Sequence, residues 1–147
     1  MEVREVITFK VPAVPCGQPR QRHRVVEAGG RTFAHNYTPQ SHPVQAFKAS
    51  MQHAARAAYN GPPIDAPITL QIEYIFPRPP SRTKKRKPNL REPHTGRPDI
   101  DNLLKTWDCL TGILWARDEL IHVVTATKWI AGDDDLPGVT ISVFWSE

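Results

Sequence analysis

The sequence has few cysteines and no long apolar run, and each lack limits what the protein can be. Its two cysteines, Cys16 and Cys109, lie far apart and outside any CxxC or Cys/His spacing. This argues against a cysteine-based metal site and favours a reducing, cytoplasmic setting. No apolar run reaches the length of a membrane-spanning helix. The first five residues do not form a basic region that leads into an apolar segment, so no secretory signal is expected there.

The overall composition of the chain is typical of one ordinary globular domain. The chain of 147 residues is 39% hydrophobic and 23% charged, which fits neither a disordered nor a membrane protein. Its sequence has no internal repeat and no obvious point of division. We therefore expect a single domain over residues 1–147.

Charge is distributed unevenly along the chain. Residues 1–91 contain 15 Lys and Arg against 5 Asp and Glu, whereas residues 92–147 contain 4 against 10. A basic half beside an acidic half suits a protein that grips a polyanion and carries out metal chemistry on it. The alternative is that the two sets of charges pair with each other, and composition alone does not decide between the two.

The periodicity of the apolar residues predicts an α/β fold. Alternation and β-branched content predict strands over residues 6–11, 68–76, 120–129 and 139–145. Spacings of three and four predict a helix from Ser41 or Pro43 to about Tyr59, with Ser41 as N-cap. They predict a second helix that begins at Asp99 and weakens or ends at Gly112. The order strand–helix–strand–helix–strand–strand indicates a mixed sheet of about four strands, whose last two strands form an antiparallel hairpin.

Two basic segments are candidates for contact with nucleic acid. Arg20, Arg22 and Arg24 precede a turn at Gly29-Gly30, and they form either a phosphate-contacting arm or an ordinary solvated loop. Residues 78–91 carry seven basic residues and no acidic one, within a loop of residues 78–96 that should be mobile without a partner. Contact with a polyanion is favoured over mere solvation here, because several phosphates can each take one cation. The candidate contacts in this loop are Arg82, Lys84, Lys85, Arg86 and Lys87.

The central motif is the stretch of residues 97–105, in which Asp99 and Asp101 stand one residue apart at the start of the second predicted helix. A structural interpretation explains each residue separately. Asp99 is a favoured helix N-cap, Asp101 complements the helix dipole, and Asp101 with Lys105 is an ion pair at i,i+4. Asp108 falls on the same predicted face, where it either belongs to the site or pairs on the surface.

A metal site is the competing interpretation. Asp118 precedes the third predicted strand, from where it could fold back toward Asp99 and Asp101. Three converging carboxylates would form a hard-oxygen site suited to Mg²⁺ or Mn²⁺. A nearby Lys105 ammonium could neutralise charge that develops on a phosphate. Together with a basic loop that holds a nucleic-acid backbone, these residues indicate a metal-dependent nuclease.

These motifs resemble the RusA-type Holliday junction resolvases of bacteria and their phages. The similarity is carried by Pro98-Asp99-Ile100-Asp101-Asn102-Leu103-Leu104-Lys105, then Asp108-x-Leu110, Trp115-x-x-Asp118 and Lys128. The opening Pro15-x-Gly17-x-Pro19-Arg20 with Tyr37-Thr38-Pro39 is also similar to that family, so the resemblance spans nearly the whole chain.

The resemblance implies a small α/β homodimer that nicks four-way DNA junctions symmetrically in recombination and repair, with Mg²⁺ as cofactor and Mn²⁺ as a substitute. By position, Asp99, Asp101 and Asp118 match the family's metal-binding aspartates, and Lys105 matches its active-site lysine. Two alternatives remain open from the residues alone. One is a non-catalytic nucleic-acid-binding protein, and the other is a metal-dependent nuclease that acts on flaps or forks.

Overall fold

Alternating apolar residues build the central strand β4 (Ile68–Phe76). Ile68, Leu70 and Ile72 are buried, whereas Gln71 between them is exposed. The buried row packs against two helices on one side, and the polar row leaves the other side of the sheet uncovered. The strand predicted over residues 68–76 is therefore confirmed to the residue.

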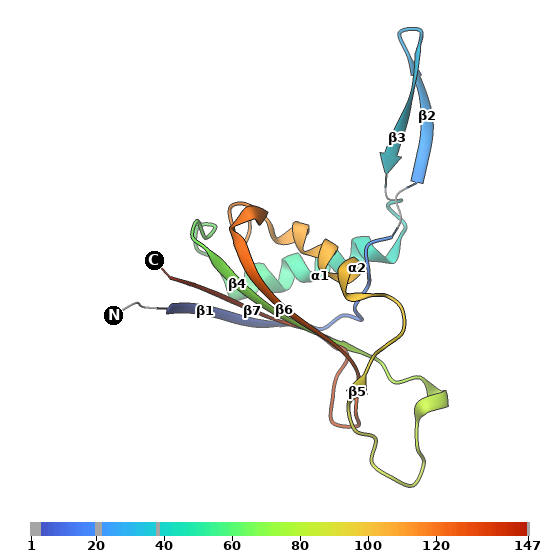
Figure 1. Cartoon of the computed structure of the whole chain (residues 1–147), viewed down its shortest axis with the longest axis vertical. Coiled ribbons are helices and arrows are strands. Elements are labelled where there is room, and N and C mark those ends of the chain that lie inside the picture. Colours follow the sequence, from blue (N-terminus) through green and yellow to red (C-terminus); the bar gives the residue numbers. More distant parts are fainter. Residues whose placement is uncertain (1–3, 20–21, 38, 147) are drawn as a thin grey trace.

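A computed structural model describes residues 4–19, 22–37 and 39–146. Within these ranges the chain forms a single α/β domain, in which a mixed five-stranded sheet carries two helices on one face (Figure 1). The strand order is β1-β7-β4-β6-β5, with β1 (Arg4–Val11), β5 (Glu92–Pro93), β6 (Ile121–Ile130) and β7 (Gly138–Ser146). The helices are α1 (Pro43–Ala58) and α2 (Ile100–Leu104), and three 3₁₀ turns are η1 (Pro80–Arg82), η2 (Lys105–Leu110) and η3 (Asp118–Leu120). No helix in the described ranges is long and apolar enough to cross a membrane.

The sheet has more strands than expected. The four predicted strands correspond to β1, β4, β6 and β7, and the short β5 adds a fifth at the edge. A separate hairpin of β2 (Arg22–Ala28) and β3 (Arg31–Tyr37) turns at Gly29-Gly30, as expected, and projects away from the sheet in Figure 1. In the described ranges these two strands pair only with each other and do not join the sheet. Their sequence therefore lacks the apolar periodicity by which the strands of the sheet were predicted.

The expected hairpin of the last two strands is wrong. β6 and β7 do not pair, because β4 lies between them, parallel to β6 and antiparallel to β7. β4 has the most continuously buried sequence of the sheet, which suits a central strand with neighbours along both of its edges. The mixed character of the sheet follows from this single insertion.

Two local predictions also need correction. The N-cap of α1 is His42 and not Ser41, because the His42 Nδ1 accepts a hydrogen bond from the Val44 amide at 3.1 Å. The second helix is α-helical only over α2 and continues as the 3₁₀ turn η2. There the buried Thr106 hydroxyl donates to the Leu103 carbonyl at 2.7 Å, and such back-bonding from threonine disturbs regular helix geometry. The turn ends near Gly112, as predicted, where the backbone φ is +86°.

The N-terminal segment after β1 packs against the start of α2. The Gln18 amide donates to the Asn102 carbonyl at 2.9 Å, and a Cβ added at Gly17 would lie 2.9 Å from the Cβ of Pro98. Only a residue without a side chain allows this close approach. The two parts of the sequence that carry the family resemblance are thus in direct contact.

We expect Gly17→Ala to lower the free energy of unfolding by about 1–3 kcal/mol, because the methyl group would overpack the contact with Pro98. Gly96→Ala is the matched control, since its Cβ would meet only the His94 ring edge at an ordinary 3.5 Å. Both substitutions lower the entropy of the unfolded chain by a similar amount. The difference between their free energies of unfolding in urea therefore measures the effect of the contact between residue 17 and Pro98. Equal stabilities for the two variants would contradict the packing described here.

Candidate functional site

The start of α2 positions the first two candidate carboxylates. Asp99 has extended backbone angles and caps the helix, because its Oδ1 accepts a hydrogen bond from the Asn102 amide at 3.0 Å. Asp101 follows in the first helical turn, where its side chain is 77% exposed. The capping role predicted for Asp99 is confirmed, and both carboxylates lie at the protein surface.

Lys105 lies one turn further along the same face. Its Nζ is 3.1 Å from the Asp101 carboxylate and 3.4 Å from the Asn102 side-chain oxygen. This is the predicted i,i+4 pair, but both side chains are more than half exposed, so it stabilises the fold by only a few tenths of a kcal/mol. Because this ion pair is weak, the Lys105 ammonium can exchange Asp101 for another anion.

Lys128 near the end of β6 fixes the turn in front of Asp99. Its ammonium donates to the Pro98 carbonyl at 2.7 Å and to the Gly96 carbonyl at 2.5 Å, across a turn whose Arg97–Pro98 peptide is cis. Residues 95–99 line a pocket at this turn together with Asn102 and Lys128. Lys128 was part of the matched sequence pattern, but nothing in its spacing indicated this role, because the contact joins residues 30 positions apart.

His94 lies beside this clamp. Its ring is 4.5 Å from that of Phe76, and its amide donates to the Lys128 carbonyl at 3.1 Å. Burial and the adjacent Lys128 charge lower the pKa of His94, so its imidazole is neutral at pH 7. Among the described residues, the cations that line the neighbouring pocket are Lys128 and Arg97.

Asp118 lies at the opposite end of β6, in η3. Its Oδ1 accepts a hydrogen bond from the Trp115 indole at 3.0 Å and another from the Thr111 hydroxyl. Trp115 is fully buried, so these bonds hold Asp118 firmly at the point where the chain enters β6. Trp115 was part of the recognised motif, and its contact explains the spacing of three residues between them.

The three aspartates do not converge within one chain. From Ile121 to Lys128, β6 extends about 23 Å at about 3.3 Å per residue, and Asp118 and Asp99 lie at its two ends. In the described ranges no three His, Cys, Asp or Glu side chains form a group that could hold a metal. The expected folding back of Asp118 fails because the extended β6, paired along its length with β4, separates the two ends.

The donor chemistry at α2 nevertheless fits a hard divalent cation. Asp99 and Asp101 supply carboxylate oxygens at the surface. Mg²⁺ keeps several waters and commonly binds proteins through only one or two carboxylates together with substrate phosphates. Two exposed carboxylates are therefore compatible with this mode of Mg²⁺ binding.

Asp108 belongs to a different contact. Its carboxylate lies 3.3 Å from the Lys48 ammonium of α1, and this surface ion pair links η2 to that helix. Of the two alternatives considered for Asp108, the surface pair is the one observed.

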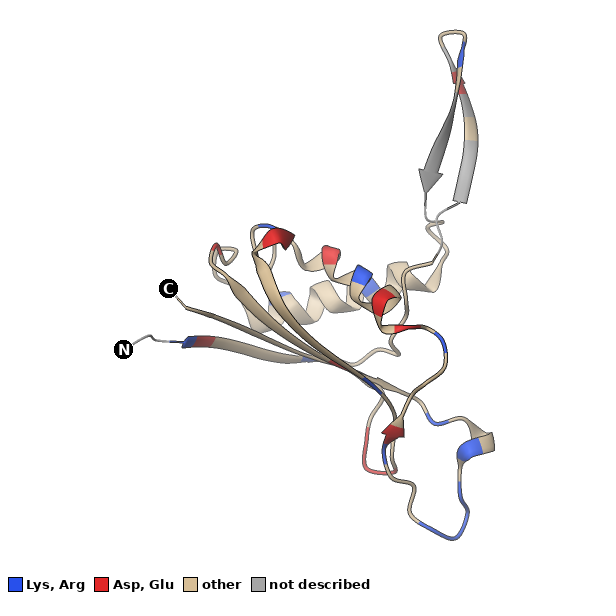
Figure 2. Cartoon of the chain, viewed as in Figure 1, with Lys and Arg blue, Asp and Glu red and all other residues tan. Residues whose placement is uncertain are grey.

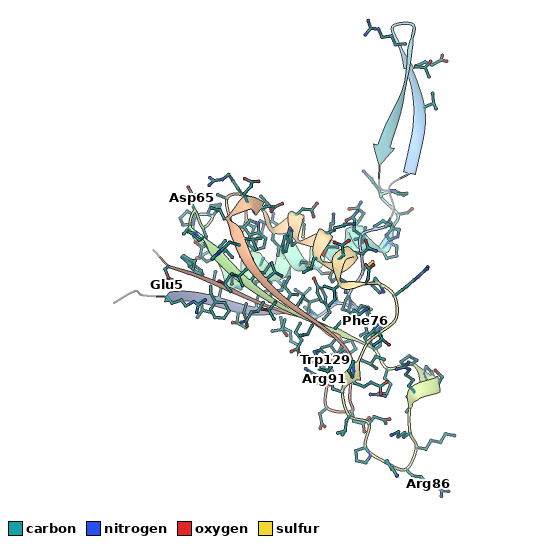
Figure 3. All side chains as sticks on the ribbon, viewed as in Figure 1. Glu5, Asp65, Phe76, Arg86, Arg91 and Trp129 are labelled. Carbon is teal, nitrogen blue, oxygen red and sulfur yellow. The ribbon has the colours of Figure 1, made fainter. Side chains whose placement is uncertain are left out.

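The basic segment of residues 78–91 is braced at its base. Arg78 donates to the carbonyls of Ala131, at 2.9 Å, and Leu90, while Arg82 pairs with Glu92 at 2.8 Å. Arg82 was a predicted DNA contact, and its charge is partly used in this internal pair. Residues 84–87 are all exposed beyond the brace, and Figure 3 shows Arg86 at the far tip of the loop.

A carboxylate and an amide hold the returning arm of this loop. Asn89 is only 8% exposed, and its backbone and side-chain N–H groups donate to Asp133 at 2.8 and 3.1 Å. Its side-chain oxygen accepts from the Lys84 amide at 2.9 Å. These hydrogen bonds, from the Asn89 backbone and then from its side chain, lower the pKa of Asp133. The sequence did not indicate this anchor, because Asn89 and Asp133 lie 44 residues apart.

The charges of the two halves pair in part. Arg91 binds Glu73 at 2.9 Å and Asp135 at 2.8 Å, and its guanidinium lies 5.8 Å from the centre of the Trp129 ring. Figure 3 labels Arg91 and Trp129 next to each other. Figure 2 shows a different arrangement elsewhere, with basic residues along the loop tip and acidic residues at α2 and at η3. Pairing between basic and acidic residues is thus observed in part, and contact of the loop tip with a polyanion stays a prediction.

The first basic segment cannot be assigned a contact. Arg20 lies outside the described residues, and of Arg22 and Arg24 only the backbone, in β2, is described.

The chain was compared with known protein families and with curated proteins. The family model for Endodeoxyribonuclease RusA matches residues 12–144, which is most of the chain. A comparison with curated proteins gives no match.

The Asp133 anchor predicts a pH-dependent loop. Because the folded-state pKa of Asp133 is lowered, its stabilisation is present above the ordinary value near 3.8 and is lost as the pH falls through the folded value. In Asp133→Asn, the free energy of unfolding measured with urea should change less between pH 7 and pH 3 than it does in the wild type. Hydrogen exchange at the Asn89 amide should be fast in this variant already at pH 7. Asp134→Asn, at the exposed neighbouring position, should keep wild-type behaviour, and equal effects of the two variants would contradict the anchor.

Proposed function

The chain belongs to the RusA endodeoxyribonuclease family, and on this basis we propose that it resolves four-way (Holliday) DNA junctions by paired, Mg²⁺-dependent nicks. The observation that carries the proposal is the clamped turn that presents Asp99 and Asp101 within the matched region. Binding a polyanion gains nothing from surface carboxylates, so their place beside basic residues favours chemistry on the backbone over binding alone.

Asp99 and Asp101 would hold the cation, with Mn²⁺ as a substitute for Mg²⁺. Asp118, which its own chain holds at the far end of β6, would join them as a third ligand only from the second copy of a dimer. When bound, the ion supplies a Lewis acid that activates water and stabilises the leaving oxygen of a phosphodiester. The chain's own groups position the reaction. Lys128 holds the backbone before Asp99, so the carboxylate is oriented before DNA arrives. Lys105 can leave Asp101 to neutralise charge that develops on the scissile phosphate.

The exposed cations at residues 84–87 would grip the DNA backbone, and Arg20, Arg22 and Arg24 are proposed as further contacts. The braced base of the loop supports this role, because a braced arm loses less conformational freedom when it binds than an unanchored loop would. A homodimer fits the chemistry, since two symmetric cuts need two sites related by a twofold axis. Recombination and repair are the processes that supply four-way junctions.

Asp101→Asn should lower the rate of junction nicking by about 100-fold or more, because the amide removes a charged metal ligand. A labelled four-way junction with Mg²⁺ provides the assay, and paired nicks at symmetric positions are expected from the wild type. Asp108→Asn is the matched control, since Asp108 pairs with Lys48 away from the turn, and it should retain activity.

Binding of the junction without cleavage at every Mg²⁺ and Mn²⁺ concentration would refute the enzyme and favour the non-catalytic alternative. Faster cleavage of flaps or forks than of the four-way junction would instead identify a nuclease of different selectivity.

Neutralising Lys84, Lys85, Arg86 and Lys87 to serine or glutamine should weaken junction binding and flatten its dependence on salt. For each phosphate that the variant no longer neutralises, the slope of log K against log salt should become shallower by about 0.9. Titrations at several salt concentrations measure this slope. Arg56→Gln, an exposed cation at the end of α1, should leave the slope unchanged. A quadruple variant with the wild-type slope would show that the loop is only solvated.

A further inference from the structure

Thr111 lies beside the carboxylate of Asp118, and a tight turn holds it there. The 3₁₀ turn η2 ends at Leu110, and the chain then reverses through Gly112, whose backbone φ is +86°. The Gly112 amide donates to the Trp115 carbonyl at 2.7 Å, and residues 111 and 115 form an isolated β-bridge. Thr111 and Trp115 therefore approach Asp118 from the two ends of one short loop.

The same loop is attached to the core of the domain. Trp115 is fully buried. The Ile64 amide donates to the Leu114 carbonyl at 2.8 Å, and the Ala116 amide donates to the Ile64 carbonyl at 2.9 Å. Trp115 lies between these two hydrogen bonds, so burial and backbone pairing together fix the indole that reaches Asp118.

Three hydrogen bonds connect Thr111, Trp115 and one oxygen of Asp118. The Trp115 indole N–H is shared between Asp118 Oδ1, at 3.0 Å, and the Thr111 hydroxyl oxygen, at 3.1 Å. The Thr111 hydroxyl donates its own proton to the same Oδ1. Because both donors meet at Oδ1, they fix the orientation of the carboxylate, and Oδ2 accepts no hydrogen bond from the described residues.

The two donors are neutral and leave the negative charge of Asp118 without a counterion. The neighbouring Arg117 lies against other acids, 3.3 Å from Asp65 and 3.7 Å from Glu119. In the described ranges no cation pairs with Asp118. An oriented carboxylate that has one unused oxygen and no cationic partner suits a hard divalent ion.

We propose that Thr111 is a positioning residue, which through its hydrogen bond to Oδ1 directs Oδ2 of Asp118 at the divalent cation of the nuclease. The proposal rests on the proposed function, because it assumes that Asp118 is a ligand of that ion. It adds the atom that binds and the two side chains that orient it, Thr111 and Trp115. Outer partners of this kind typically change metal affinity or activity by about 10–100-fold when they are removed.

Thr111 and Trp115 contribute in different ways. A single donor fixes the place of Oδ1 but lets the carboxylate turn about it, whereas a second donor from another direction removes that freedom. Trp115 also fills the core, so its replacement would test packing together with positioning. Thr111 is only partly buried, and its hydroxyl can be removed with little change in the shape of the side chain.

The dependence of nicking on Mg²⁺ tests the role of the Thr111 hydroxyl. In Thr111→Val, the Mg²⁺ concentration that gives half-maximal nicking of a four-way junction should rise by about 10-fold or more, while the rate at saturating Mg²⁺ falls less. Thr111→Ser keeps the hydroxyl and should restore the wild-type Mg²⁺ dependence. Thr8→Val is the matched control, because Thr8 is exposed on β1 and its hydroxyl lies 3.0 Å from that of Ser142.

A role of Thr111 in stability alone predicts a different result. Partial unfolding lowers the concentration of active enzyme, and hence the rate at every Mg²⁺ concentration, without moving the midpoint of the Mg²⁺ dependence. An unchanged midpoint in Thr111→Val, an equal shift in Thr8→Val, or a shifted midpoint in Thr111→Ser would overturn the proposal.

Nuclear magnetic resonance gives a readout that needs no cleavage. Mn²⁺ is paramagnetic and broadens the resonances of protons a few ångströms away, and the Trp115 indole proton is bonded to the carboxylate proposed to bind the ion. Mn²⁺ alone should broaden this resonance in the ¹⁵N-labelled wild type. Thr111→Val should need a higher Mn²⁺ concentration, and Asp118→Asn should show no broadening. No broadening in the wild type, or equal broadening in all three proteins, would refute Oδ2 as the ligand atom.

The two proposals fail in different ways. Nicking by the wild type, with the same Mg²⁺ midpoint in Thr111→Val, would refute the positioning role and leave the nuclease intact. Broadening by Mn²⁺ that depends on Thr111, in a protein that never cuts DNA, would retain the positioning of Asp118 and refute the nuclease.

Discussion

The double hydrogen bond from Lys128 to the turn before Asp99 is the contact on which the candidate site depends. It joins the end of a sheet strand to the start of α2, two parts of the chain that no local pattern connects. Gly17 contacts the same turn, because its missing side chain lets the N-terminal segment lie against Pro98. The exposed carboxylates can therefore belong to a very short helix and still be positioned precisely.

The order of the strands in the sheet determines where the candidate aspartates lie. Placing β4 between β6 and β7 makes β6 nearly an edge strand and puts Asp118 and Asp99 at its two ends. Within its described residues, a single chain thus carries the parts of a metal site without bringing them together.

Basic residues in this protein have two distinct uses. Arg78, Arg82 and Arg91 lie at the base of the loop, where they bind carbonyls and carboxylates of the same domain. The residues at the loop tip extend into solvent. The net basic charge is therefore a mixture of internal structure and available surface, and only the surface part can contribute to binding a polyanion.

Much of this protein was determined by the sequence itself. Alternation predicted β4 to the residue, spacings of three and four predicted α1, and the Asp99 and Asp101 motif indicated both the cap and the family. Local periodicity specifies these features because each depends on near neighbours. The tertiary structure alone decided the sheet order, the Lys128 clamp, the Asn89–Asp133 anchor and the separation of Asp118, because each depends on which distant surfaces become buried together, and a local pattern does not encode that choice.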